Sequence, residues 1–172
     1  NTRETLLQKI YDEKIEIDCD TPLEDLGYGN LVDQLYKKVA RPNVVNPIFL
    51  TEHPISLSPL ARANDDNPEI TDRFQLIING AEIINAYSEL VDPQEQERRL
   101  EEQAALKADG DEEAMPMDHE YISAMEVGMP PISGWGMGID RVVQLLTNAD
   151  NIKDVVMFPL MRPLNIENKD SE

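Results

Sequence analysis

The pair Asn79-Gly80, set between two β-prone segments, constrains the fold of this chain more than any other feature. Residues 73–79 and residues 80–90 are both rich in isoleucine and contain aromatic side chains. Asn and Gly are the residues that most readily take the positive φ angles of a type I′ turn. The pattern therefore predicts an antiparallel β-hairpin.

Two more strands and several helices are expected around the hairpin. An apolar run at residues 48–51 and a glycine-rich segment at residues 134–139 predict strands. Asp92 followed by Pro93, and Asp118 further along, are typical residues for the start of a helix. Helices are expected at residues 2–14, 30–40, 93–108, 118–127 and 139–148. These elements predict an α+β fold, with an antiparallel β-sheet flanked by helices.

Length and charge limit the class of protein. The chain has 172 residues, 41% of them hydrophobic, which is enough for one domain with a core. It carries 15 Lys and Arg against 34 Asp and Glu, and the net charge of −19 opposes binding to nucleic acid. No apolar run approaches the ~20 residues that cross a bilayer. We therefore expect a cytoplasmic protein, and because the chain starts with Asn rather than Met, we expect it to be part of a longer one.

Alternate glycines mark the segment before the last predicted helix. Gly134, Gly136 and Gly138 remove every second side chain from a strand, which leaves one face bare for a flat ligand or for tight packing against a helix. The glycine patterns of dinucleotide-binding turns and of phosphate loops are both missing from the sequence. Arg141 follows at the start of the helix, where a guanidinium can contact the anionic or aromatic part of a nucleotide.

A row of polar side chains is expected on the second strand of the hairpin. Asn85, Tyr87 and Glu89 share one face because side chains alternate along a strand, whereas Glu82 falls on the other face. A carboxylate, an aromatic ring and an amide would together suit a cationic side chain. The same pattern also fits the solvated outer face of a sheet, and the pattern alone favours that second interpretation.

Two smaller features are interpreted as structural. His53 lies between Glu52 and Pro54 and is expected to fix its loop by hydrogen bonding rather than to act as a general acid or base. The acidic run at residues 109–113 is expected to be a solvated loop, and the single cysteine, Cys19, is expected to be structural.

The stretch Gly-Trp-Gly-Met-Gly-Ile-Asp-Arg, which ends at Arg141, resembles motif 3 of class II aminoacyl-tRNA synthetases. The resemblance implies that Gly134, Gly136 and Gly138 back the adenine of ATP. It also implies that Arg141 caps the adenine and reaches the γ-phosphate.

Residues 73–90 are similar to the lysine-binding strand of lysyl-tRNA synthetases, through Arg-Phe at their start and Gly-Ala-Glu-Ile-Ile-Asn-Ala-Tyr-Ser-Glu-Leu at their end. The similarity implies that Glu89 holds the ε-ammonium group of lysine and that Asn85 and Tyr87 line the lysine pocket. It also implies that Glu82 is a ligand of a Mg²⁺ ion that bridges the ATP phosphates. A twist or bulge near residues 83–84 would then be needed to bring Glu82 to the face of Asn85.

One residue departs from the family pattern. Gln75 stands where the family usually has a glutamate as a second magnesium ligand. The amide oxygen of Gln75 can still coordinate, but it carries less charge and should bind magnesium more weakly.

The resemblance extends over about residues 47–163 and implies a division of the chain. Residues 47–164 are expected to be the C-terminal half of a class II catalytic domain, residues 1–46 a helical insertion of that domain, and residues 165–172 a flexible tail. Motifs 1 and 2 of the family have no counterpart in these residues, so the chain by itself is expected to be inactive.

The activity implied is that of a lysine–tRNA ligase, which uses ATP to form lysyl-adenylate and transfers the lysyl group to tRNA(Lys). The resemblance also implies a homodimer and tRNA contacts made mainly by N-terminal regions beyond this chain, without a membrane. Two alternatives are a paralogue that lysylates a translation factor such as elongation factor P, and a non-catalytic regulatory module with the same fold. The run Ala-Tyr-Ser-Glu-Leu that ends at Leu90 argues against the paralogue, and Gln75 is the one hint of a regulatory module.

Overall fold

The computed structural model describes residues 2–19 and 21–161. The chain divides into two compact units, Asn1–Met137 and Gly138–Glu172. The predicted tail at residues 165–172 lies outside the described residues.

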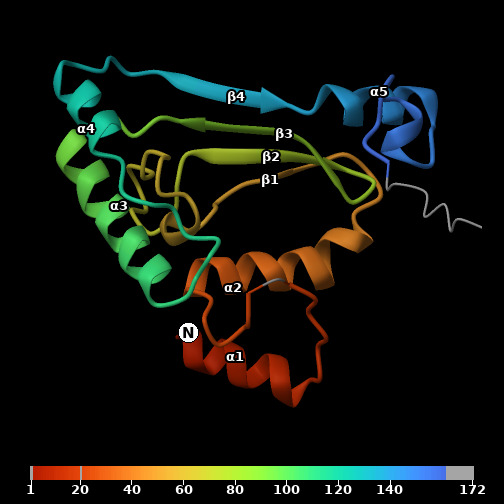
Figure 1. The fold of residues 1–172 in the computed structure, drawn as a ribbon, viewed down its shortest axis with the longest axis horizontal. Coiled ribbons are helices and arrows are strands. Elements are labelled where there is room, and N and C mark those ends of the chain that lie inside the picture. The colour runs from red at the N-terminus through yellow and green to blue at the C-terminus, as the bar shows by residue number, and fades with distance from the viewer. Residues whose placement is uncertain (1, 20, 162–172) are drawn as a thin grey trace, which may run out of the picture. The chain divides into compact units, whose positions relative to one another are not determined.

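A four-stranded antiparallel sheet is the centre of the first unit (Figure 1). Its strands are β1 (Ile48–Leu50), β2 (Arg73–Ile78), β3 (Ala81–Ser88) and β4 (Ser133–Met137), in the order β1-β2-β3-β4. Asn79 and Gly80 take φ angles of 49° and 70° in the turn between β2 and β3. The predicted hairpin and the α+β fold class are therefore confirmed.

The pairing of β2 with β3 contains a bulge. Leu76 pairs with Ile84 and Ile77 pairs with Glu82, so that Ile83 has no partner on β2. A bulge turns the residues on one of its sides to the opposite face of the sheet. The irregularity that the sequence required near residues 83–84 is thus present.

Among its described residues, the first unit has four α-helices beside the sheet. They are α1 (Arg3–Asp12), α2 (Tyr28–Leu35), α3 (Pro93–Ala108) and α4 (His119–Glu126). The Asp92 side chain accepts hydrogen bonds from the backbone N–H groups of residues 94 and 95, and Asp118 caps α4 in the same way. Helix α2 is shorter than predicted, because the chain continues from it into wider π-type turns at Tyr36–Ala40.

Two clusters of apolar side chains hold these helices. Ile10, Leu26 and Leu31 pack together in the N-terminal segment, and Leu100, Ile122 and Met125 pack between α3 and α4. Helix α3 is joined to the loop before β2 by polar contacts: Gln96 Nε2 donates to the carbonyl of Pro59, and Arg99 donates to that of Ala61.

The acidic run at residues 109–113 corrects an expectation. Asp111 is fully buried rather than solvated. Its carboxylate accepts hydrogen bonds from the backbone N–H of Gly27 at 2.7 Å, from Asn30 Nδ2 at 2.9 Å and from the backbone N–H of Glu113 at 3.1 Å. The N-terminal segment is therefore bonded to the loop between α3 and α4, because a buried carboxylate requires such donors.

The second unit contains α5 (Ile139–Thr147) and a 3₁₀ turn at Ile152–Asp154. Asn148 ends α5 in the left-handed conformation, with a φ of 53°. The apolar residues 155–158 form neither a helix nor a strand. Over the described part of the chain, every helix is too short or too polar to span a bilayer.

Candidate functional site

One face of the sheet gathers most of the predicted site residues. Gln75 of β2 pairs with Asn85 of β3, Arg73 pairs with Tyr87, and Ile77 pairs with Glu82. Residues that pair across two strands project to the same face, and so do every second residues of one strand. The bulge at Ile83 therefore places Glu82 on the same face as Asn85 and Tyr87, which we call the polar face.

Glu82 and Gln75 are in direct contact on the polar face. Gln75 Nε2 donates a hydrogen bond to Glu82 Oε2 at 2.8 Å. Among the described residues, no cluster of three or more His, Cys, Asp and Glu side chains is arranged to hold a metal ion. One carboxylate and one amide are a donor set that suits Mg²⁺ only when the phosphates of a substrate supply further oxygens.

Arg73 is a residue of this face to which the sequence assigned no role. Its Nε donates to Asn85 Oδ1 at 3.0 Å, and its Nη1 donates to Ser58 Oγ at 2.9 Å. Burial lowers the pKa of the Arg73 guanidinium, and the negative charges of Glu82 and Asp33 oppose that effect. Arg73 therefore ties β2 to a predicted substrate-binding residue and to the loop at residue 58.

Glu89 lies just beyond the end of β3, beside the glycine strand. A Cβ atom at Gly134 would lie 2.6 Å from Glu89 Oε1, closer than any real contact, so the carboxylate occupies the space that the missing side chain leaves. Gly134 pairs with Tyr87, and Gly136 pairs with Asn85. A Cβ at Gly136 would meet no heavy atom within 4 Å. The glycine strand thus seats Glu89 at one position and leaves open space at the other.

Burial shapes the electrostatics of the polar face. It raises the pKa of the Glu89 carboxyl, and it raises that of the Tyr87 hydroxyl together with the negative charge of Glu89. A carboxylate whose charge is disfavoured by burial gains when a cation comes to lie against it. The row of Asn85, Tyr87 and Glu89 can therefore accept an ammonium group at its Glu89 end.

Two cavities open on the polar face. One, of about 180 Å³, lies between Arg73, Asn85 and Tyr87 and the loop at residues 57–61. The other, of about 330 Å³, lies between Gln75, Glu82 and His53 and the side chains of α2. Predicted site residues line both cavities, and the polar face is therefore the candidate substrate site.

His53 is buried in the wall of the second of these cavities, with 5% of its surface exposed. Burial lowers the pKa of its imidazole, and the charge of Arg73 adds to that effect. Neither ring nitrogen has a hydrogen-bond partner among the described residues. The loop is fixed instead by the backbone carbonyl of His53, which accepts from the N–H of Thr71 at 2.9 Å and from its hydroxyl at 3.1 Å.

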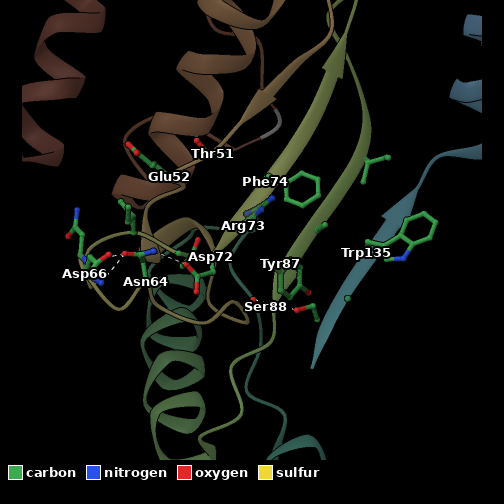
Figure 2. Close-up of a pocket in the computed structure, with 17 residues that line it drawn as sticks. Thr51, Glu52, Asn64, Asp66, Asp72, Arg73, Phe74, Tyr87, Ser88 and Trp135 are labelled. Atoms are coloured by element: carbon green, nitrogen blue, oxygen red, sulfur yellow. Dashed lines mark hydrogen bonds between the residues drawn. The ribbon is translucent and has the colours of Figure 1, made fainter. Parts of the chain in front are cut away.

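A third cavity, of about 1030 Å³, lies mainly against the opposite face of the sheet. Figure 2 shows Phe74 projecting from β2 and Trp135 from β4, with Asn64, Asp66 and Asp72 on the neighbouring loop. Asn64 Nδ2 donates to Asp72 Oδ1 at 2.8 Å and holds that loop together. Of the predicted site residues, this cavity includes Tyr87 and Gly134, and its base is aromatic rather than polar.

Gly138 and Arg141 belong to the second unit, where Gly138 precedes α5 and Arg141 is its third residue. A Cβ at Gly138 would lie 3.3 Å from Arg141 Cδ, so the glycine gives the arginine side chain room to pass. The remaining predicted site residues belong to the first unit.

The antiparallel sheet, the glycine strand at its edge and the polar row beside it are the features of a class II aminoacyl-tRNA synthetase catalytic domain. The family model described as "tRNA synthetases class II (D, K and N)" matches residues 1–162, and the chain belongs to that family.

Proteins named lysine–tRNA ligase are among its relatives. The chain is 51% identical to one from Enterobacter sp. (strain 638) over 138 residues, which are 80% of this chain and 27% of that protein. It is 48% identical to one from Helicobacter pylori (strain Shi470) over 168 residues, 97% of this chain and 32% of that protein. A heat-inducible lysine–tRNA ligase of Escherichia coli (strain K12) is 50% identical over 137 residues, 80% of this chain and 27% of the relative. The chain thus spans about a third or less of the length of these relatives.

Proposed function

We propose that this chain is part of a lysine–tRNA ligase and contributes its lysine site and much of its ATP site. The observation that carries the proposal is the polar face, where the bulge at Ile83 brings Glu82 into line with Asn85 and Tyr87. The similarity to proteins named lysine–tRNA ligase supports it.

In this proposal, Asn85, Tyr87 and Glu89 contact different parts of the lysine substrate. Glu89 binds the ε-ammonium. Burial raises the pKa of Glu89 and so disfavours its charged form, and the positive charge of the ammonium offsets this free-energy cost. The ring of Tyr87 packs along the methylene stem, and Asn85 lines the remainder of the pocket. A strand holds these groups more rigidly than a loop would, so the substrate carboxylate is presented in one orientation.

The nucleotide occupies the glycine strand in this proposal. Gly134, Gly136 and Gly138 back the adenine, and Arg141 reaches the γ-phosphate. Glu82, with the amide oxygen of Gln75 as a weaker second ligand, would hold a Mg²⁺ ion, which would supply positive charge to the ATP phosphates. The Gln75–Glu82 hydrogen bond keeps the carboxylate in place on the polar face.

The reaction requires no covalent nucleophile from the protein. A carboxylate oxygen of lysine attacks the α-phosphorus of ATP, and the bond to the leaving pyrophosphate breaks. A hydroxyl at the 3′ end of tRNA(Lys) then attacks the lysyl carbonyl, and AMP leaves. Catalysis depends on positioning and on neutralising phosphate charge, because no group on the polar face has to form a bond to the substrate.

The proposal extends to the partners of the whole protein. We place the enzyme in the cytoplasm as a homodimer. The net charge of −19 opposes contact with a polyanion, so tRNA(Lys) would be bound mainly by regions other than this chain.

Substitution Glu89→Gln, in the protein at its full gene-encoded length, tests the assignment of lysine. The loss of a charge-assisted contact is expected to raise the KM for lysine by about 10- to 100-fold and to leave the KM for ATP unchanged. Steady-state ATP–pyrophosphate exchange measures both constants. Glu101→Gln, which alters an exposed acid of α3, is the matched control. An unchanged KM for lysine in Glu89→Gln would remove the basis of the proposal.

A further inference from the structure

Arg73 is held on the polar face in an unusual way for a partly buried arginine. Its guanidinium donates to one side-chain amide, Asn85, and to two groups of a loop, the hydroxyl of Ser58 and the carbonyl of Leu57 at 3.3 Å. Within residues 2–19 and 21–161, no carboxylate oxygen lies within 4.0 Å of its nitrogens. An arginine that serves only to tie a loop would more commonly be paired with an acid when it is taken out of water.

The contact with Asn85 fixes the polarity of that side chain. A guanidinium has five N–H donors and no acceptor, so the Asn85 atom that faces Arg73 Nε at 3.0 Å is the amide oxygen. The amide nitrogen of Asn85, with its two N–H donors, is then directed to the remaining space of the polar face. That space is open on the side of the glycine strand, because a Cβ at Gly136, the partner of Asn85, would meet no atom within 4 Å.

We propose that Arg73 is a positioning residue, which fixes Asn85 as a hydrogen-bond donor toward the substrate. The two ends of the polar row then differ in polarity: Asn85 offers N–H groups to an acceptor oxygen of the substrate, and Glu89 offers oxygens to its ammonium. The inference rests on the proposed function for the nature of the substrate. It does not rest on that function for the orientation of Asn85.

The contacts of Arg73 that orient Asn85 require the geometry of a guanidinium. Arg73 lines both cavities of the polar face, one together with Asn85 and Tyr87 and the other together with Gln75 and Glu82. A lysine at this position would have a single nitrogen, which cannot reach Asn85 and Ser58 with the fixed fork of a guanidinium. Arginine is therefore required for the double contact, and the positive charge alone does not replace it.

The first arm of the experiment is a double-mutant cycle in the full-length protein, read by lysine-dependent ATP–pyrophosphate exchange. Arg73→Lys is expected to raise the KM for lysine about 10-fold and to change kcat less than 3-fold, as loss of one charge-assisted hydrogen bond predicts. In the background of Asn85→Ala, the same substitution is expected to change the KM by less than about twofold, because Arg73 acts through Asn85. Ser58→Ala removes the contact of Arg73 with the Ser58 hydroxyl and keeps those with the Leu57 carbonyl and Asn85, so it is expected to leave the KM for lysine within about twofold.

Two results of this arm would overturn the proposal. One is an equal effect of Arg73→Lys with and without Asn85, which would mean that Arg73 contacts the substrate or acts through the fold. The other is an effect of Ser58→Ala as large as that of Arg73→Lys, which would assign the role to the loop. If Arg73→Lys does not fold, Arg73→Gln provides the same cycle.

The second arm does not depend on the reaction. A crystal structure of the Arg73→Lys protein is expected to show the Asn85 amide turned from its place in the wild-type protein, and an unchanged Asn85 side chain would overturn the proposal. If the wild-type protein shows no exchange with lysine, the proposed function fails, and the crystal structures still decide whether Arg73 orients Asn85.

Discussion

At the scale of single residues, the site depends on an extra residue in strand β3 and on a glycine in strand β4. Ile83 is a bulge residue without a partner on β2, and the bulge places Glu82 on the face that holds Asn85. Gly134 has no side chain, and the Glu89 carboxylate occupies the space that a side chain there would fill. The bulge places Glu82 on the polar face, which regular alternation along β3 would not do, and the glycine leaves room there for the Glu89 carboxylate.

Substitution Gly134→Ala is expected to act on lysine rather than on the fold. The added methyl would lie 2.6 Å from Glu89 Oε1, so the carboxylate must move, and the end of a flexible side chain moves at little cost in stability. The expected result is a KM for lysine raised by about 10-fold, with a free energy of unfolding changed by less than about 1 kcal/mol. Exchange kinetics and urea denaturation measure the two effects.

Gly136→Ala is the matched control, because the space beside it is open. It is expected to raise the KM for ATP and to spare that for lysine. Equal KM values for lysine in wild-type and Gly134→Ala protein would show that Gly134 does not seat Glu89.

Substitution Gln75→Glu tests the departure from the family pattern. A second carboxylate beside Glu82 replaces a hydrogen bond with repulsion between like charges, which a divalent cation relieves. The melting temperature of the variant is expected to lie below that of the wild type without magnesium and to recover when Mg²⁺ and ATP are added. The Mg²⁺ concentration for half-maximal exchange is expected to fall several-fold.

Gln75→Met serves as the control for the loss of the hydrogen bond without added charge. It should destabilise the protein to the same extent with and without magnesium. A melting temperature of Gln75→Glu that does not respond to Mg²⁺ would argue against a metal ion at Glu82.

At the scale of secondary-structure elements, the N-terminal segment is held by contacts to a distant part of the sequence. Asp111 reaches Gly27 at the start of α2 and Asn30 within it, and so joins α2 to the turn after α3. Helix α2 in turn lines the cavity beside Gln75 and Glu82, through Val32 and Asp33. A loosened N-terminal segment would therefore affect the end of the polar face that carries Gln75 and Glu82.

Asp111→Ala is expected to lower the free energy of unfolding by about 3–5 kcal/mol, since it leaves several buried N–H donors without an acceptor. Urea denaturation of the variant measures this loss. Glu112→Ala, which alters the exposed neighbouring acid, is expected to change stability by less than about 0.5 kcal/mol. Similar losses in the two variants would mean that the carboxylate of Asp111 does not hold the segment.

The elements themselves could be predicted to within a few residues, because their signals are local. The Asn79-Gly80 turn, the Asp92 and Asp118 caps and the glycine strand each depend on a few neighbouring residues. No local pattern predicted the bulge. Its position was expected only because the family resemblance requires Glu82 and Asn85 to lie on the same face of the sheet. The burial of Asp111 and the bond from Arg73 to Asn85 depend on residues far apart in sequence or on different strands, and no local pattern indicates them.

At the scale of the whole molecule, charge and site chemistry point to different partners. The chain carries a net charge of −19, yet we propose that the polar face, which includes Arg73 and Glu89, binds a small zwitterion with an ammonium on its side chain. These properties agree if the chain binds lysine and ATP and leaves most of the contact with tRNA to other regions of the protein. The central claim is therefore that the polar face selects lysine.

Amino-acid-dependent ATP–pyrophosphate exchange by the full-length protein tests that claim most directly. Lysine is compared with aspartate and asparagine, the substrates of the other members that the family description covers. We expect exchange with lysine to exceed exchange with either of the others by at least about 1000-fold in kcat/KM, since Glu89 repels a carboxylate and lacks a donor for an amide oxygen. Exchange that is supported equally well by aspartate or asparagine, or that fails with lysine, would show that the polar face does not select lysine.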